Sequence, residues 1–334
     1  MEPGKLPLQL LRSILAKVPM EDERVLVSGG VGEDAAAVSF GNCLLVAKTD
    51  PITFATDHIG WYAVNVNAND VAASGARPAW FLASVLLPTT WNECEAERLF
   101  DQLIAACREL GVTLVGGHTE VTYDLSRPIV VGCMLGEAGP QGIVRTAGAK
   151  PGDDIVLTKG IAIEGTALLA REAGQQLTKR GVDAALIARA KDLLFSPGIS
   201  VVREAQVACQ STSLHSMHDP TEGGLATALL EVGVAADVGM RVDREAIPVL
   251  PETEAICKAL GLDPLGLLAS GALLITLAPA GTPALLSALR QAGIAAWRIG
   301  VVTEAAAGFK VHTPTGLQDL PQFARDEVAR FFST

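Results

Sequence analysis

Apolar residues recur along this chain with two different periods, and the two periods alternate from one segment to the next. Short apolar runs such as Cys43–Lys48, Trp80–Leu87 and Ile129–Leu135 have the length and composition of buried β-strands. Between them, Gly60–Ser74 and Asn92–Leu110 carry apolar positions at helical spacing, and each is followed by a glycine that favours a helix end. With shorter strands at Ala35–Val38 and Thr113–Gly116, the first half predicts an α/β domain.

A domain boundary is predicted at Thr146–Asp154, a segment rich in small and turn-forming residues. We therefore expect an N-terminal domain at 1–148 and a C-terminal α/β domain at 149–334, which suits a chain of 334 residues. Further strands and helices are predicted at Ile155–Thr158, Thr166–Glu172, Asp183–Leu194, Leu225–Ala236, Gly239–Val242, Glu252–Leu260, Ala272–Leu277, Pro283–Gln291 and Ala296–Val302.

Two segments bear on targeting. Met1–Met20 carries apolar positions at helical spacing interrupted by polar residues, so it predicts a surface helix and no export signal. Pro264–Leu289 has no charged residue, but prolines and glycines break it well before the run of about 18 apolar residues that a membrane span needs. The six cysteines are scattered, with no metal-type spacing. We expect a cytoplasmic protein with reduced thiols and no membrane partner.

Charge narrows the chemistry further. The chain has 26 basic and 37 acidic residues, a net charge of −11, and no basic tract. Aromatic residues make up 4% of it. Nucleic-acid binding is therefore not expected, since it needs basic surfaces and stacking side chains. An acidic protein that handles nucleotides is expected to bind them together with Mg²⁺.

Three glycines within four positions, Gly29, Gly30 and Gly32, precede the carboxylates Glu33 and Asp34. Bare backbone N–H groups in such a loop form an anion-binding concavity, and carboxylates beside a phosphate suit a bridging Mg²⁺. A flexible hairpin is the alternative for this loop taken alone.

Lys48 and Asp50 come at the end of a predicted apolar strand, where α/β proteins place ligand groups. Lys48 suits a phosphate and Asp50 a metal, and the alternative is an ordinary strand end terminated by Pro51. The helix that follows has no Lys or Arg between Asp57 and Arg77. Its polar residues therefore resemble buried groups with assigned partners more than a solvated face. They are Asn65, Asn67, Asn69 and Asp70.

Two further polar loops follow predicted strands or precede helices. Gly116–Glu120 is read as a flexible turn that offers His118 and Glu120, although a lone histidine is more often structural. His218–Gly224 opens a predicted helix, where free N–H groups and the helix dipole favour an anion. Helix capping by an Asp or Thr of this string is the alternative. Together these loops predict one composite site.

The ordered motifs Gly-Glu-Asp-Ala-Ala, Lys-Thr-Asp, Asn-Asp-Val-Ala with Gly-Ala-Arg-Pro, Gly-Gly-His-Thr and His-Asp-Pro-Thr-Glu-Gly-Gly-Leu resemble the aminoimidazole ribonucleotide (AIR) synthase superfamily. The resemblance covers nearly the whole chain, and its second half is most similar to the branch of the hydrogenase maturation factor HypE. It implies a two-domain PurM-like fold with mixed sheets, an N-terminal sheet that pairs across a homodimer, and ATP with Mg²⁺ near the domain junction.

Together, the loops and the resemblance assign roles to named residues. Mg²⁺ ligands are expected at Asp34, Asp50 and Asp70, and phosphate contacts at Lys48, Gly29, Gly30 and Gly32. Asn69, His118 and Glu120 are expected to support metal or substrate, with His118 standing where HypE has a metal-binding Asp. Asp219, Gly223 and Gly224 are expected at the far side of the phosphates. Lys48, His118 and Asp219 are the catalytic candidates, and Glu164 and Thr166, in a predicted loop, are weaker ones.

The expected activity is ATP-dependent phosphorylation of an amide or carbonyl oxygen on a small-molecule or protein-borne substrate. A maturation factor in cyanide-ligand synthesis, a small-molecule kinase and a non-catalytic nucleotide sensor stay open as alternatives. HypE proteins carry a C-terminal cysteine, whereas no cysteine follows Cys257 here and Asp326–Phe331 predicts a docked helix. We therefore expect the cysteines to stay unmodified and a separate substrate to be used.

Overall fold

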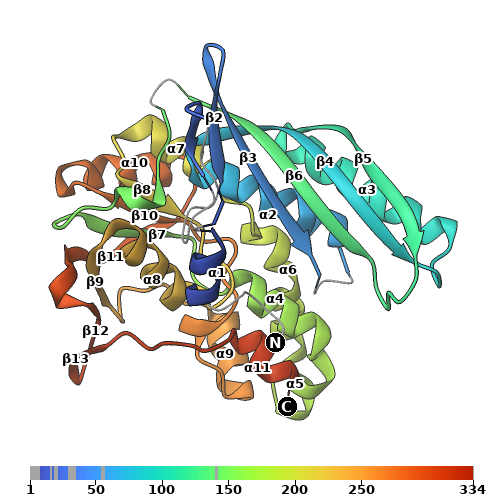
Figure 1. The fold of residues 1–334 in the computed structure, drawn as a ribbon. Helices are drawn as coiled ribbons and strands as arrows, with labels where there is room; N and C mark the ends of the chain where they lie inside the picture. The colour runs from blue at the N-terminus through green and yellow to red at the C-terminus, as the bar shows by residue number, and fades with distance from the viewer. Residues whose placement is uncertain are drawn as a thin grey trace. The chain divides into compact units, whose positions relative to one another are not determined.

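The computed structural model describes residues 8–15, 17–18, 22–28, 35–53, 57–139 and 142–333. These residues group into two compact units that divide between Ile143 and Val144, and helix α1 (Leu8–Leu15) groups with the second of them. Figure 1 shows the elements of both units. We call them the N-terminal unit and the C-terminal unit and describe each by itself.

The N-terminal unit is built on a mixed sheet whose strand order is β1-β2-β3-β6-β4-β5. Figure 1 labels β2, β3, β6, β4 and β5 of this sheet in that order. Neighbouring strands are antiparallel except β4 and β5, which are parallel and joined through α3. Parallel neighbours need such a crossover, because a tight turn cannot connect them. The elements are β1 (Val25–Val27), β2 (Ala36–Phe40), β3 (Cys43–Ile52), α2 (Ile59–Ala73), β4 (Ala76–Pro88), α3 (Glu93–Leu110), β5 (Thr113–Thr122) and β6 (Ile129–Ala138).

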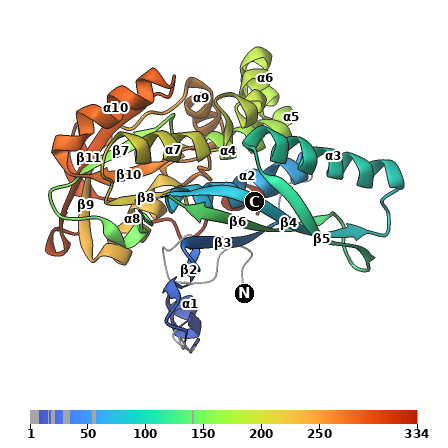
Figure 2. The ribbon, with the colours of Figure 1, turned by 90° about the horizontal axis from the view of Figure 1, so that it is seen from above.

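Helix α2 is buried between the sheet and α3 (Figure 2). Every residue of α2 except Val66 is buried. Gly60 lets α3 approach closely, since a Cβ there would lie 2.7 Å from the Leu99 carbonyl oxygen. The Gly60 N–H donates to Gln102 Oε1 at 3.1 Å, which satisfies one of the free donors of the first turn. The predicted burial of the polar residues of α2 is confirmed, for Asn65, Asn67, Asn69 and Asp70 alike.

The other face of this sheet carries neither helix of the N-terminal unit within the described residues. Along β4, Phe81 is fully buried toward α2, whereas its neighbour Trp80 is 36% exposed on the opposite face. We call this second face the open face. Its partly or fully exposed apolar side chains include Trp80, Leu82, Val131, Cys133 and Leu135.

The C-terminal unit is built on a second mixed sheet, of order β13-β12-β9-β11-β7-β10-β8, in which the described strands are parallel only at β12 and β9. Strands β7, β10 and β8 are buried along their whole length. Helix α8 belongs to the main core, and α7 packs with α10, which also contacts β11 (Figure 1). The elements are β7 (Asp154–Thr158), α4 (Ile163–Glu172), α5 (Gly174–Lys179), α6 (Ala184–Asp192), α7 (Val202–Ser211), β8 (Ser216–His218), α8 (Gly224–Ala236), β9 (Val238–Asp243), α9 (Pro251–Leu260), β10 (Leu274–Leu277), α10 (Thr282–Gln291), β11 (Ala296–Glu304), β12 (Phe309–Thr313), β13 (Gly316–Asp319) and α11 (Glu327–Phe332).

The predicted α/β class with mixed sheets is confirmed, and the uncharged segment Pro264–Leu289 contains β10 and all but the last two residues of α10. Within the part of the chain that is described, no helix is long and apolar enough to cross a membrane. The predicted closing helix is present as α11, and its N-cap Asp326 accepts from the Val328 N–H.

Two predicted strand ends are wrong. Strand β3 continues through Pro51 to Ile52. Strand β2 pairs with β3 only as far as Ala47, so among the described strands β6 alone flanks Pro51, and its missing N–H costs little. Strand β5 likewise runs through the predicted turn to Thr122. Position 117 requires a glycine because the backbones of β5 and β4 approach closely there, and a Cβ would overlap the Ala83 carbonyl of β4.

The alternation of buried and exposed positions on α3 gives a test of the core. Leu103 is fully buried and Ile104 is 44% exposed. We expect Leu103→Ala to lower the free energy of unfolding by about 2–5 kcal/mol, because it leaves a cavity under α2. Ile104→Ala is the matched control and should cost less than about 1 kcal/mol. Urea unfolding measures both, and equal losses would contradict the packing described for α3.

Candidate functional site

In the N-terminal unit, Lys48 lies between two carboxylates. Its Nζ is 2.8 Å from Asp70 Oδ2 and 3.3 Å from Asp50 Oδ2. Lys48 and Asp50 are two residues apart on β3 and so share the sheet face that meets α2, which carries Asp70. The side chains are 21%, 36% and 5% exposed for Lys48, Asp50 and Asp70. The fold therefore brings together three predicted site residues from two elements.

This cluster has an excess of negative charge. Burial raises the pKa of Asp50 to about 6, with the Lys48 charge opposing this rise and the Asp70 charge adding to it. One ammonium thus only partly balances two carboxylates, of which Asp70 is buried and Asp50 is partly exposed. A further positive charge would favour the ionised form of Asp50.

The residues present fit a divalent cation bound together with phosphates. Two carboxylates converge on a point that already attracts a cationic group, the Lys48 ammonium. Mg²⁺ is commonly held by one or two carboxylates plus phosphate oxygens and water. Over the described ranges no group of three or more His, Cys, Asp or Glu could hold a metal ion. The predicted third ligand, Asp34, and the predicted phosphate loop of Gly29, Gly30 and Gly32 lie outside the described residues.

The asparagines of α2 have different environments. Asn67 Oδ1 accepts from the Asp50 N–H at 2.8 Å, so this side chain joins the cluster. Asn65 Nδ2 donates to the Trp61 carbonyl of its own helix at 3.0 Å. Asn69, a predicted site residue, is fully buried. The sequence singled out these asparagines together and gave no sign that Asn67 would contact β3.

His118 and Glu120 lie on β5 and not in a turn, so this part of the prediction is corrected. Their side chains are 69% and 51% exposed, and His118 Nε2 is 3.3 Å from Glu120 Oε2. His118 is paired with Ser84 of β4, which lies on the open face, so the His118 side chain lies on the open face too. Glu120, two residues further along β5, shares this face. Strand β5 is three strands from β3 in the sheet, a separation of about 14 Å at the usual strand spacing. Within this unit, His118 therefore does not join the Lys48 cluster.

In the C-terminal unit, the predicted polar string begins at the last residue of β8 and leads into α8. His218 is buried, and its Nε2 is 3.0 Å from Glu231 Oε2 of α8. Asp219 is also buried, at 1% exposure. The N-cap of α8 is Gly223, in the left-handed region at φ 80°, without a side-chain cap. The alternative of capping by Asp219 or by Thr221 is therefore wrong.

A carboxylate of the same chain occupies the N-terminus of α8. Asp326 Oδ2 accepts from the Gly223 N–H at 2.7 Å. Burial raises the pKa of Asp326 to about 6, against the opposing effect of its backbone hydrogen bonds from Gly223, Val328 and Leu268. The positive end of α8 thus holds an anionic group, but this group is a side chain more than a hundred positions away in the sequence and not the predicted ligand.

Glu164 and Thr166 lie inside α4, not in a loop, because this helix already begins at Ile163. Thr166 Oγ1 is 2.8 Å from Thr253 Oγ1, a buried contact that joins α4 to α9. Burial raises the pKa of Glu164 to about 7, with a Ser270 hydrogen bond opposing this and the charges of Asp326 and Glu222 adding to it.

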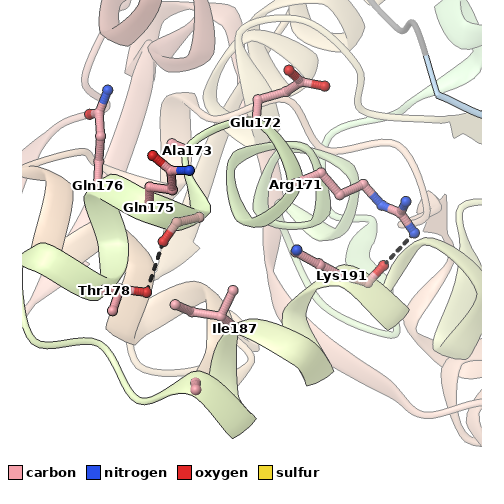
Figure 3. Close-up of a pocket in the computed structure, with 10 residues that line it drawn as sticks. Arg171, Glu172, Ala173, Gln175, Gln176, Thr178, Ile187 and Lys191 are labelled. Atoms are coloured by element: carbon pink, nitrogen blue, oxygen red, sulfur yellow. Dashed lines mark hydrogen bonds between the residues drawn. The ribbon is translucent and has the colours of Figure 1, made fainter.

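A cavity of about 490 Å³ lies elsewhere on the C-terminal unit, among α4, α5 and α6 (Figure 3). Arg171 and Lys191 line it, and Arg171 Nη2 donates to the Lys191 carbonyl at 3.2 Å. The guanidinium also lies over the Phe195 ring, 5.7 Å from its centre. No predicted site residue lines this cavity.

Two family descriptions match the chain. Residues 32–138 match the N-terminal domain of AIR synthase related proteins, and residues 150–312 match their C-terminal domain. The chain belongs to the AIR synthase related family. Among its relatives in this family, the carbamoyl dehydratase HypE of Cupriavidus necator is 36% identical over 82% of this chain and 77% of the relative. The carbamoyl dehydratase HypE of Rhizobium leguminosarum bv. viciae is 33% identical over 77% of this chain and 73% of the relative.

Solved structures of AIR synthase related proteins share this fold. The hydrogenase maturation protein HypE in complex with ATP matches with a TM-score of 0.72 and 24% identity, over 95% of this chain and 91% of that one. A chain of the HypE–HypF complex matches with a TM-score of 0.77 and 20% identity, over 94% of this chain and 99% of that one. The predicted PurM-like, HypE-like fold is confirmed.

The buried Glu164 of this AIR synthase related protein gives stability a pH dependence. Its pKa rises from 4.5 to about 7, so the folded protein retains a proton that the unfolded chain loses. Its contribution to stability is full below pH 4.5 and is lost as the pH rises through about 7. Glu164→Gln has no such proton to lose and should be more stable than the parent by about 2–3 kcal/mol above this range.

Urea unfolding at a series of pH values measures this difference. Glu172→Gln, at the exposed end of the same helix, is the control and should keep the pH dependence of the parent. If Glu164→Gln and the parent lose stability in parallel between pH 5 and pH 8, Glu164 is not protonated in the folded protein.

Proposed function

We propose that this chain is an ATP- and Mg²⁺-dependent enzyme that phosphorylates an amide or carbonyl oxygen. The convergence of Lys48, Asp50 and Asp70 on one cationic position carries this proposal. The relatives named carbamoyl dehydratase and the fold shared with a HypE–ATP complex support it. These relatives also favour dehydration of a carbamoyl group over simple phosphorylation of a small molecule.

In this proposal Asp50 and Asp70 hold Mg²⁺, which neutralises charge on the phosphates of ATP. Lys48 then turns from the carboxylates to a phosphate oxygen. Asp34 and the loop of Gly29, Gly30 and Gly32 are proposed to complete the phosphate contacts. The chain has little covalent chemistry to do, because phosphoryl transfer depends mainly on positioning and charge stabilisation.

The proposed reaction is a dehydration. The carbamoyl oxygen attacks the γ-phosphorus of ATP and ADP leaves, which turns the oxygen into a good leaving group. The C–O bond then breaks and phosphate departs with this oxygen. The nitrogen gives up its two protons, one to the departing phosphate and one to water, as the C≡N bond forms. The balance is one carbamoyl group and one ATP consumed, and one cyano group, one ADP and one phosphate formed.

We infer that the carbamoyl group arrives on a separate substrate. Burial raises the pKa of the Cys107 and Cys209 thiols to about 11 and that of Cys257 to about 12, so these three are poor nucleophiles. The HypE–HypF complex supports a protein-borne substrate, because a HypE chain there assembles with another protein. His118, Glu120 and Asp219 stay proposed contacts to substrate or phosphate, as do Asn69, Gly223 and Gly224.

Single turnover with labelled ATP tests the function. With a carbamoylated substrate and Mg²⁺, the parent should form ADP, phosphate and the cyano product in equal amounts. Asp50→Asn removes one metal ligand and should slow this turnover at least about a hundredfold. Asp101→Asn, exposed on α3, is the control.

Other products of this experiment would replace the proposal. A stable phosphorylated product without dehydration identifies a kinase, and ATP bound without turnover identifies a nucleotide sensor. A carbamoyl or cyano adduct on one of the six cysteines, seen by intact-mass spectrometry, would show that the chain itself carries the substrate. Full activity of Asp50→Asn would exclude the proposed metal site.

We also propose that the chain forms a homodimer through the open face of the N-terminal sheet. In the described part of its own unit, no helix covers the strip of apolar side chains on this face, which includes Trp80 at 36% exposure. Patches of this kind on a soluble protein typically mark an interaction site. A second copy suits it, because a twofold axis pairs one face with itself.

Light scattering tests the dimer. The parent should have twice the 34.7 kDa mass of the chain at micromolar concentration. Leu82→Arg buries a charge in the proposed interface and should give the single-chain mass. Ile104→Arg, exposed on the helix side of the unit, should remain dimeric. A monomeric parent would contradict the proposal.

A further inference from the structure

The side chain of Asn67 is held by three hydrogen bonds. Its Oδ1 accepts from the Asp50 N–H at 2.8 Å, and its Nδ2 donates to the Asp50 carbonyl at 3.3 Å and to the Ala63 carbonyl at 2.8 Å. The partners fix which end of the amide is which, because a backbone N–H only donates and a carbonyl only accepts. Asn67 is fully buried, so water does not compete for these bonds.

Two of these bonds satisfy the backbone N–H and C=O of Asp50, which a neighbouring strand would otherwise pair. Strand β2 pairs with β3 from Cys43 to Ala47, and β6 pairs with β3 as far as Ile52. Within the described residues, the backbone around Asp50 therefore has a strand on one side only. The Asn67 amide presents one donor and one acceptor to this backbone, as a strand residue does.

The opposite strand leaves room for this amide. Asp50 is paired with Gly132 of β6. A Cβ on Gly132 would lie 2.8 Å from Asn67 Cγ and would overlap its Nδ2. Any other residue at position 132 would therefore push against this amide, and also against the Phe81 ring at 2.8 Å.

Asn67 also shares a helix face with Asp70, since the two are three residues apart on α2. One rigid helix thus carries one of the two carboxylates and the group that holds the backbone of the other. We propose that Asn67 is a positioning residue that sets the separation of Asp50 and Asp70 so that they share one cation. This inference rests on the proposed function, in which that cation is Mg²⁺ bound with ATP.

Hydrogen exchange of the protein without metal or nucleotide tests the contact itself. In Asn67→Ala, the amide proton of Asp50 loses its acceptor and should exchange at least about tenfold faster. Asn65→Ala is the matched control, because Asn65 is also buried and also donates to a carbonyl four residues earlier in its own helix, that of Trp61. This hydrogen bond, unlike those of Asn67 to Asp50, does not reach β3. Unchanged exchange over Lys48–Ile52 in Asn67→Ala would overturn the inference.

Calorimetric titration of ATP at a series of Mg²⁺ concentrations tests the consequence. Asn67→Ala should need about tenfold more Mg²⁺ for half-maximal ATP binding, and Asn65→Ala the same amount as the parent. Gly132→Ala is a second variant in case Asn67→Ala does not fold, and should show the same direction of change. Parent-like Mg²⁺ dependence in folded Asn67→Ala or Gly132→Ala would overturn the positioning role.

Asp50→Asn separates failure of this inference from failure of the proposed function. If Asp50→Asn loses Mg²⁺-dependent ATP binding while Asn67→Ala keeps it, the proposed function stands and the positioning role is wrong. If Asp50→Asn binds ATP and Mg²⁺ as the parent does, the proposed metal site is wrong and the positioning role falls with it.

Discussion

The polar cluster of the N-terminal unit depends on the ion pair between Lys48 and Asp70. Asp70 is 5% exposed and Lys48 is 21% exposed, so both charges are largely removed from water. Taking a carboxylate and an ammonium out of water costs several kcal/mol each, and their attraction only partly offsets this. Apolar residues of similar volume would pack at this position without that cost. Ligand binding therefore explains this buried ion pair between β3 and α2 better than stability does.

The polar groups at the N-terminus of α8 already balance one another, whereas those around Lys48 do not. At the N-terminus of α8, the backbone donor of Gly223 is already satisfied by the Asp326 carboxylate of the same chain. Around Lys48, by contrast, two carboxylates share one ammonium, and the pKa of Asp50 is raised to about 6. A Mg²⁺ ion bound with nucleotide phosphates would balance the excess negative charge of Asp50 and Asp70. A phosphate at the N-terminus of α8, by contrast, would have to displace the Asp326 carboxylate. The proposed metal site is therefore assigned to the N-terminal unit.

Local pattern predicted most of the fold because most elements are determined by local chemistry. Helix α3 shows this clearly, with an Asn92 capping box at its start and Gly111 in the left-handed region at its end. The prediction failed where a remote partner decides the outcome. Pro51 stays in a strand because β2 has already ended, and Gly117 is extended because β4 lies against it. No local signal linked Asp326 to Gly223, which are 103 positions apart.

The different surroundings of Asn65 and Asn67 show what helical spacing in a sequence can predict and what it cannot. Spacing alone places Asn67 with Asp70 on one face of α2 and Asn65 with Asn69 on another. It cannot say which of these faces meets β3, because a helix surrounded by protein has no apolar stripe that points to the core. Val66 is the one residue of α2 that is not buried. The sequence therefore predicts that Asn67 and Asp70 share a face of α2. That Asn67 contacts Asp50 follows only from the packing of α2 against β3.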